Sequence, residues 1–173
     1  MITLVLGGAR SGKSRFAQQL ATDNQLPVLY IATATALDEE MQERIIRHQQ
    51  DRPSEWQLCE CSLDLINTLA EECQKQQTIL VDCLTLWLNN QLFHQPAQDF
   101  SALFNRLLST LSNTNATIIF VANEVGLGVI PLGEVSRQFV DEAGRLNQQL
   151  AQIADKVFFI AAGLPLTLKG SAS

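Results

Sequence analysis

Several features that would place this chain in a large protein class are missing from it. There is no excess of basic residues, because 12 lysines and arginines face 18 aspartates and glutamates and the net charge is −6. A nucleic-acid partner usually leaves a basic footprint, so this charge argues against one. No apolar run approaches the roughly 20 residues that a membrane-spanning helix needs, and residues 1–6 are too short and too uncharged for a secretory signal. We therefore expect a cytoplasmic protein without a membrane span.

The chain also lacks the cysteine spacings that bind zinc or form redox pairs. Its four cysteines, Cys59, Cys61, Cys73 and Cys83, make no C-x-x-C pair. We expect them to be reduced and mostly buried, which fits a cytoplasmic setting.

No internal repeat, linker or second-domain boundary is visible either. With 173 residues the chain is long enough to bury a substantial core. We expect residues 1–169 to form a single domain and residues 170–173 to be a frayed tail.

What the chain does have is a phosphate-binding sequence near its start. The apolar run of residues 2–6 leads directly into G-G-A-R-S-G-K-S at residues 7–14, which matches G-x-x-x-x-G-K-S at every fixed position. In such a loop, glycines let the backbone amides converge on phosphate oxygens, and the following helix directs its positive end at the anion. Lys13 would place its charge at the β- and γ-phosphates, and Ser14 would offer its hydroxyl to Mg²⁺. The predicted nucleotide-binding residues of this loop are Gly7, Gly8, Ala9, Arg10, Ser11, Gly12, Lys13 and Ser14.

Apolar runs of strand length alternate with helical patterns along the rest of the chain. Strands are expected at residues 28–32, 54–60, 78–82, 116–122 and 157–161, with a short edge segment at 166–169. Helices are expected at 13–21, 63–73, 83–90, 100–111 and 133–155, and a loop at 91–98. The inward face of the longest helix should consist of Phe139, Val140, Ala143, Leu146, Leu150 and Ile153. The alternation predicts an α/β fold with a mostly parallel sheet, whose functional edge lies at the carboxyl ends of the strands.

Two acidic residues follow predicted strands at that edge. Asp82 ends a buried run, the pattern of an acid that orders Mg²⁺ through water while Ser14 holds it directly. Ser14 and Asp82 are therefore the predicted metal-site residues. Glu124 begins a glycine-bearing loop, where it could orient a substrate hydroxyl or a metal-bound water, or cap a neighbouring helix.

One of the two histidines lies in an unusual charged segment, residues 37–53. Arg44, His48 and Arg52 follow i, i+4, i+8 spacing, which on a straight helix places an imidazole between two guanidinium groups. Pro53 disfavours helical geometry at Arg52. Two guanidinium groups in this arrangement could bind a polyphosphate, and the imidazole between them could attack it. The other interpretation is a structural histidine at a boundary between helix and core, and spacing alone favours that one.

The residues by themselves indicate a Mg²⁺-nucleotide domain and name no activity. The base-reading motif N-K-x-D is absent, which argues against a switch GTPase. Over nearly its whole length the sequence resembles the bifunctional adenosylcobinamide kinase / adenosylcobinamide-phosphate guanylyltransferases. The resemblance rests on G-G-A-R-S-G-K-S at 7–14, Y-I-A-T-A at 30–34, D-x-E-M-x-x-R-I-x-x-H-x-x-x-R-P-x-x-W at 38–56, D-C-L-T at 82–85, N-E-V-G-x-G-x-x-P at 123–131 and R-x-F-x-D-x-x-G-x-x-N-Q at 137–148.

The resemblance implies a P-loop NTPase with a RecA-like sheet, a ring-shaped homotrimer and two reactions on a corrinoid. ATP or GTP first phosphorylates the hydroxyl of adenosylcobinamide. GTP then transfers GMP to that phosphate through a guanylylated histidine. The family's modified histidine matches His48, which reverses the preference drawn from spacing and makes His48 and Lys13 the expected catalytic residues. The same match assigns the guanine nucleotide site to Thr33, Asp51, Arg52, Glu60 and Asp82.

Several points stay open on the sequence. Arg47 stands beside the matched histidine where some relatives carry a second histidine, so the role of that neighbour is undecided. A P-loop kinase of another small metabolite, with His48 structural, is one alternative. A RecA-like assembly subunit without small-molecule chemistry is the other. The sequence distinguishes neither ATP from GTP in the kinase step nor the place where the corrinoid docks.

Overall fold

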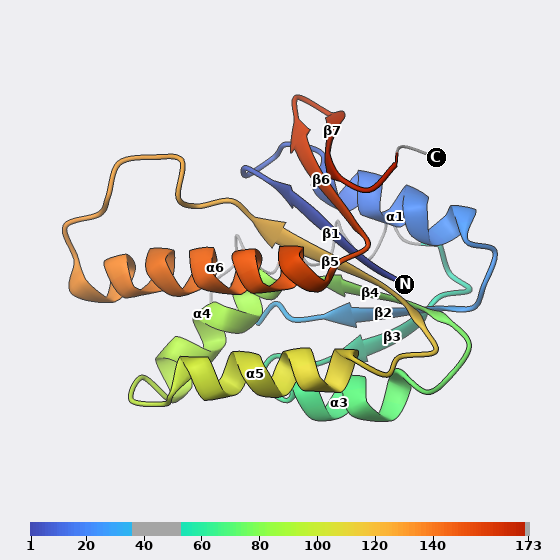
Figure 1. Cartoon of the computed structure of the whole chain (residues 1–173), viewed down its shortest axis with the longest axis horizontal. Coiled ribbons are helices and arrows are strands. Elements are labelled where there is room, and N and C mark those ends of the chain that lie inside the picture. Colours follow the sequence, from blue (N-terminus) through green and yellow to red (C-terminus); the bar gives the residue numbers. More distant parts are fainter. Residues whose placement is uncertain (36–52, 172–173) are drawn as a thin grey trace.

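The fold is built on one β-sheet with helices packed on both of its faces (Figure 1). The computed structural model describes residues 1–35 and 53–171. The strands are β1 (Ile2–Gly7), β2 (Val28–Ala32), β3 (Gln57–Glu60), β4 (Thr78–Asp82), β5 (Thr117–Asn123), β6 (Lys156–Ala161) and β7 (Leu164–Lys169). The helices are α1 (Lys13–Asp23), α3 (Leu65–Glu72), α4 (Leu84–His94), α5 (Phe100–Leu111) and α6 (Glu134–Ile153).

The described strands follow the order β3-β2-β4-β5-β1-β6-β7. All neighbouring pairs are parallel except β6 and β7, which form an antiparallel hairpin. Because the parallel strands point the same way, the carboxyl ends of β1, β2, β4 and β5 meet at one edge, as the arrowheads in Figure 1 show. The predicted mostly parallel α/β sheet is confirmed, and the carboxyl ends of these four strands lie at one edge, as predicted.

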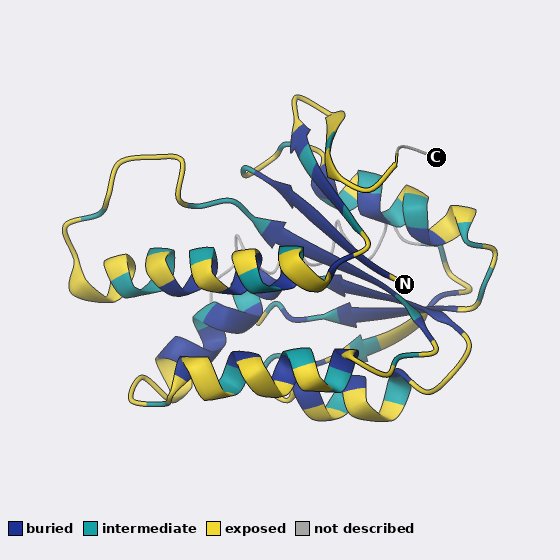
Figure 2. Ribbon diagram, viewed as in Figure 1, coloured by how far each residue is buried: buried dark blue, intermediate teal, exposed yellow. Residues whose placement is uncertain are grey.

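Each face of the sheet has its own apolar core. On one face, Leu4 and Leu6 of β1 pack with residues of α3, α4, α5 and α6. On the other face, Val5 packs with Ala17 and Ala21 of α1. Side chains alternate across a strand, so a strand buried on both faces is mostly apolar, as β1 is apart from the buried Thr3. Figure 2 shows the consequence, with the strands buried and the outer sides of the helices exposed.

Several boundaries differ from the sequence prediction: β3 begins at Gln57 and not at residue 54, and β7 begins at Leu164 and not at residue 166. The predicted loop at 91–98 is shorter, because α4 continues to His94. Gln91 and Leu92 are buried there, and the side-chain Nε2 of Gln91 donates to the Leu63 carbonyl oxygen over 2.7 Å. A polar residue with a buried backbone partner thus extends the helix where the sequence alone looked irregular.

The inward face of α6 is also only partly as predicted. Ile153 is 39% exposed, because the helix ends there and the extended Ala154 is buried instead. Glu142 and Asn147, both polar, are buried on α6. The four cysteines are free and mostly buried, as predicted, with Cys59 half-buried and the other three buried. None of the described helices is both long and apolar enough to cross a membrane.

Candidate nucleotide site

The loop between β1 and α1 has the conformation that its sequence predicts. Gly12 adopts φ of 94° and Arg10 adopts φ of 57°, and both angles lie in the left-handed region. Gly12 is the N-cap of α1 and supplies no side-chain cap, so the first amides of the helix are left for another acceptor. An anion held at this point would satisfy them and face the positive end of the helix.

Gly7 is required at the start of the loop for a different reason, close approach. A Cβ added there would lie 2.5 Å from Ser11 Oγ and 2.7 Å from the carbonyl oxygen of Ile160. At Gly8 an added Cβ would meet nothing within 4 Å. The turn between β6 and β7 also contacts this loop, because the Gly163 amide donates to the Ser11 carbonyl oxygen over 2.8 Å.

Lys13 lies largely buried under this loop, with 9% of its surface exposed. Its ammonium group donates to the Gly8 carbonyl oxygen over 3.1 Å. Burial lowers the pKa of Lys13, and the nearby Asp82 carboxylate partly opposes this shift. A triphosphate would offer the ammonium group stronger partners than one carbonyl oxygen.

Asp82 ends β4 at the same edge, and two residues of β2 and its following loop hold it. The Tyr30 hydroxyl donates to Asp82 Oδ2 over 3.2 Å. The Thr33 hydroxyl donates to the Cys83 carbonyl oxygen over 2.7 Å and accepts from the Cys83 amide over 2.8 Å. Thr33 is fully buried, so its hydroxyl braces the backbone after Asp82. Burial, with Asp82 beside it, raises the pKa of the Cys83 thiol to about 11, so this thiol is neutral at pH 7.

The donor set fits a magnesium ion held mainly by phosphate and water. Ser14 is the second residue of α1 and is half-buried, and Asp82 is half-buried at the end of β4. Among residues 1–35 and 53–171 no group of three acidic, histidine or cysteine side chains is placed to hold a metal. Mg²⁺ commonly takes one or two protein oxygens and completes its shell with water and substrate phosphates.

The two glutamates predicted near the site have different surroundings. Glu60 ends β3 beside Ala32 of β2, so it lies at the same edge, with β2 and β4 between its strand and β5. The Glu124 amide donates to the Gly7 carbonyl oxygen over 3.0 Å, and Glu124 Oε1 accepts from the Gly126 amide over 2.7 Å. Glu124 therefore shapes its own loop, and the interpretation that it caps a neighbouring helix is wrong for the helices described.

Asn123 was missed by the sequence analysis. It ends β5 directly beside Gly7 of β1, and its backbone amide donates to Thr85 Oγ1 over 2.7 Å. The signal that could have found it is the one that found Asp82, a polar residue at the carboxyl end of a buried strand.

Three of the predicted site residues, His48, Asp51 and Arg52, lie outside the described residues, as does Arg47. The segment that carries them follows β2, whose carboxyl end is at the functional edge. The structure brings the phosphate loop, Thr33, Asp82 and the backbone of Glu124 to that edge, and places Glu60 near its far end.

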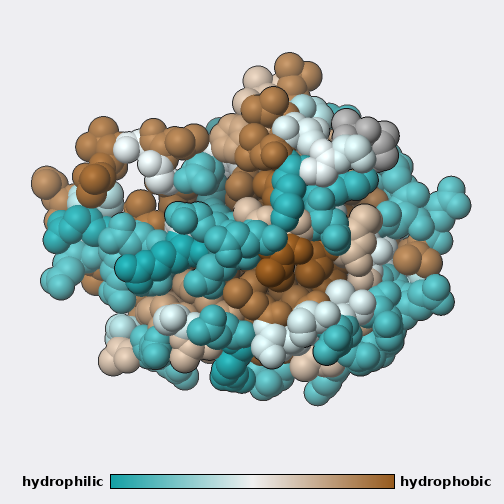
Figure 3. All heavy atoms as spheres, viewed as in Figure 1, coloured by the Kyte–Doolittle hydropathy of each residue, from teal (hydrophilic) through white to brown (hydrophobic). Residues whose placement is uncertain are grey.

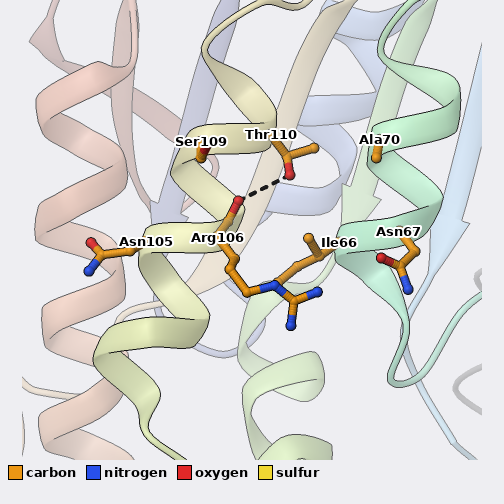
Figure 4. A pocket seen from close by; sticks show the side chains of 7 residues that line it. All are labelled: Ile66, Asn67, Ala70, Asn105, Arg106, Ser109 and Thr110. Carbon is orange, nitrogen blue, oxygen red and sulfur yellow. Dashed lines mark hydrogen bonds between the residues drawn. The ribbon is translucent and has the colours of Figure 1, made fainter.

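A separate groove of about 420 Å³ lies between α3 and α5 (Figure 4). Its lining includes Asn67, Arg106 and Thr110, and the Thr110 hydroxyl donates to the Arg106 carbonyl oxygen over 3.0 Å. None of the predicted site residues that the structure describes lines it. Among the described residues that line the groove, Arg106 is the only ionisable one. The described residues that are predicted to bind nucleotide therefore lie at the sheet edge and not in this groove.

The comparisons with known proteins agree with this geometry. The sequence model of a family described as cobinamide kinase / cobinamide phosphate guanyltransferase matches residues 3–168. A bifunctional adenosylcobalamin biosynthesis protein CobP from Pseudomonas aeruginosa is 50% identical over 170 residues, covering 98% of each chain. A bifunctional adenosylcobalamin biosynthesis protein CobU from Salmonella typhimurium is 38% identical, covering 98% of this chain and 100% of the relative.

Among solved structures, the RadB recombinase superimposes with a TM-score of 0.51 at 16% identity, covering 91% of this chain and 73% of that chain. This likeness concerns the fold alone. It confirms the predicted P-loop NTPase fold with a RecA-like, mostly parallel sheet flanked by helices.

Proposed function

Because the chain belongs to the cobinamide kinase / cobinamide phosphate guanyltransferase family, we propose that it phosphorylates adenosylcobinamide with ATP or GTP and then transfers GMP from GTP to the product. The chain is a bifunctional enzyme of adenosylcobalamin biosynthesis. The observation that supports the finer assignment is the meeting of the phosphate loop with Asp82 at one sheet edge, next to the start of the segment that holds His48. Residues 1–169 would act as one catalytic domain.

In the kinase step, the hydroxyl oxygen of the corrinoid forms a bond to the γ-phosphorus. The bond from that phosphorus to the bridging β,γ-oxygen breaks, and the hydroxyl proton goes to solvent. Lys13 would exchange the Gly8 carbonyl for the β- and γ-phosphate oxygens, and the amides at the start of α1 would hold the same anion. Ser14 and Asp82 would hold Mg²⁺, which when bound neutralises phosphate charge.

In the guanylyl step, a ring nitrogen of His48 forms a bond to the α-phosphorus of GTP, and pyrophosphate leaves. A phosphate oxygen of the phosphorylated corrinoid then displaces the histidine from that phosphorus. A neutral imidazole is nucleophilic near neutral pH, which suits this role. Going through the histidine leaves only one step in which two anionic reactants meet. Lys13 and the loop amides would stabilise the departing pyrophosphate.

The remaining predicted nucleotide residues are kept as part of this proposal. Asp51, Arg52 and Glu60 would contact the guanine nucleotide. Thr33 would act mainly through the Cys83 backbone, because its hydroxyl already has two partners there. The corrinoid is the expected partner, and a cytoplasmic location stays a prediction.

We extend the proposal to a homotrimer, as the family resemblance implies. The loop between β5 and α6, residues 124–133, projects from the body and is largely exposed (Figure 2). Figure 3 shows hydrophobic residues gathered on the surface there. We call this loop the apolar arm. Leu127, Val129, Ile130 and Leu132 on it are 72–97% exposed. Contiguous exposed apolar surface of this kind supports an interface with another chain.

The test uses the purified chain, adenosylcobinamide and GTP, with products weighed by mass spectrometry. GTP labelled at the α-phosphate should leave acid-labile, base-stable label on the protein. The label should disappear in His48→Ala and remain in His94→Ala, which removes the other histidine of the chain. Label that survives in His48→Ala would overturn the histidine assignment. Phosphorylation of a different metabolite without any label would instead favour the small-metabolite kinase, and hydrolysis stimulated only by a macromolecule would favour the assembly subunit.

A further inference from the structure

Three adjacent strands end in small or polar residues on the same face of the sheet. Side chains alternate across a strand, so a residue shares its face with the residue two positions earlier. Val5, Leu80 and Val121 all belong to the apolar core on the α1 face. The strand ends two positions further on, Gly7, Asp82 and Asn123, therefore face α1 and the phosphate loop as well. The strand order β4-β5-β1 places Asn123 between the metal-site carboxylate and the start of the loop.

Asn123 is held firmly in that place by its backbone. Its amide donates to Thr85 Oγ1 over 2.7 Å, and the next amide, of Glu124, donates to the Gly7 carbonyl oxygen over 3.0 Å. The end of β5 is thus fixed both to the start of α4 and to the first residue of the loop.

The side chain of Asn123, in contrast, is incompletely paired. Its Oδ1 is buried and has no hydrogen-bond partner. Among the described residues three side-chain atoms share this state, and a second one is Ser11 Oγ, which lies against Gly7. Buried polar groups are nearly always hydrogen-bonded, so unpaired ones that flank the same glycine indicate a place where a ligand completes the pairing.

From this geometry we infer that Asn123 binds the terminal phosphate of the nucleoside triphosphate. The inference rests on the proposed nucleotide site and adds to it the residue that distinguishes a triphosphate from a diphosphate. A carboxamide can turn by half a revolution about its last side-chain bond, so its N–H can replace its oxygen and donate to a phosphate oxygen. The terminal phosphate is the one in reach, because Asn123 lies between the loop and Asp82, where the β- and γ-phosphates and Mg²⁺ would lie.

Binding of two nucleotides in the presence of Mg²⁺ tests this inference. The dissociation constants of GDP and of guanosine 5′-(β,γ-imido)triphosphate are measured by calorimetry for the wild type and for Asn123→Ala. A hydrogen bond to a charged phosphate should be worth roughly tenfold or more in affinity. Asn123→Ala should therefore weaken the affinity for the triphosphate analogue about tenfold or more and change the affinity for GDP less than about twofold.

Two further variants keep the test decisive. Asn123→Asp preserves the shape of the side chain, so the variant should fold. Its added negative charge should weaken the affinity for the triphosphate analogue more than Asn123→Ala does. Gln149→Ala removes the third unpaired atom, Gln149 Oε1, which lies toward the carboxyl end of α6, and should leave both dissociation constants unchanged.

An unchanged ratio of the two constants in both Asn123 variants would overturn the inference, and would mean that water alone pairs with the buried atom. A wild type that binds neither nucleotide would instead contradict the proposed function.

Discussion

At the scale of single residues, burying the charged Lys13 side chain lowers the stability of the folded chain, and a bound phosphate would offset this loss. Its pKa is lowered from 10.5 because the ammonium group is buried. Below the lowered pKa, the folded chain carries the full cost of that burial. The cost disappears as the pH rises through the lowered pKa toward 10.5, because the folded state then loses a proton that the unfolded chain still holds.

Lys13→Met should therefore separate stability from binding. At pH 7 the variant should be as stable as the wild type or more stable, because an uncharged side chain of similar length carries no desolvation cost. Its affinity for the triphosphate analogue should fall by roughly two orders of magnitude, since the phosphates lose a buried cationic partner. Thermal unfolding and calorimetry measure the two effects. Lys75→Met, which removes an exposed lysine paired with Glu72, should change neither much.

Thr33 allows a prediction about bracing. Thr33→Val keeps the shape but leaves the buried amide and carbonyl of Cys83 without their partner, and should cost roughly 2 kcal/mol or more of the free energy of unfolding. Thr33→Ser keeps the hydroxyl and should cost about 1 kcal/mol through the lost methyl group. Urea unfolding measures both. If Thr33→Val weakened only nucleotide binding and unfolded like the wild type, Thr33 would be a ligand contact without a bracing role.

At the scale of elements, the turn from β1 to α1 depends on one glycine for space. Gly7→Ala would place a Cβ 2.7 Å from the Ile160 carbonyl oxygen, which is fixed in β6, and should cost about 1–3 kcal/mol of unfolding free energy. Gly8→Ala is the matched control, because nothing lies within 4 Å of its added Cβ. It should stay within about 0.5 kcal/mol of the wild type. Equal losses in the two variants, measured by denaturant unfolding, would contradict this explanation.

The elements that sequence predicted best are those whose local signals and packing agree. Residues 100–111 were predicted as a helix, and α5 spans Phe100–Leu111. Asp99 caps it by accepting from the Ala102 amide over 3.1 Å, and its apolar residues recur at helical spacing. The last turn of α4 had no such local signal. This turn forms because the side-chain Nε2 of Gln91 donates a hydrogen bond to the Leu63 carbonyl oxygen, a contact that depends on tertiary structure.

The residues of the candidate site also fall into those visible in the local sequence and those that depend on tertiary structure. The phosphate loop and Asp82 follow from local sequence, since a fixed spacing or a strand-ending acid is visible without a structure. The brace from Thr33 to Cys83 joins the loop after β2 to the end of β4, so it needs the pairing of those strands. Asn123 ends an apolar run as Asp82 does, so the same local signal was present, but its place between the strands that end in Gly7 and Asp82 follows only from the strand order.

At the scale of the whole molecule, the described chain buries most of its apolar residues and leaves two apolar surfaces exposed. One is the apolar arm. The other is the outer strand β7, where Leu164, Leu166 and Leu168 are 56–72% exposed. Figure 1 shows the arm at one end of α6 and β7 at another side of the sheet, so one chain presents two separate apolar regions. Different patches on one subunit suit head-to-tail contacts, which can close into a ring.

The apolar arm should therefore control the assembly of the chain. In the double variant Val129→Ser and Leu132→Ser, two side chains that are each 97% exposed become polar, so an interface that buries them loses much of its driving force. Light scattering coupled to size exclusion should give a trimer for the wild type and a smaller species for the double variant, with thermal stability of the monomer fold unchanged. Phe93→Ser, at a residue of α4 that is 70% exposed and lies outside both surfaces, should stay trimeric. A wild type that is monomeric, or a double variant that keeps the wild-type mass, would show that the arm is exposed for some reason other than contact between copies.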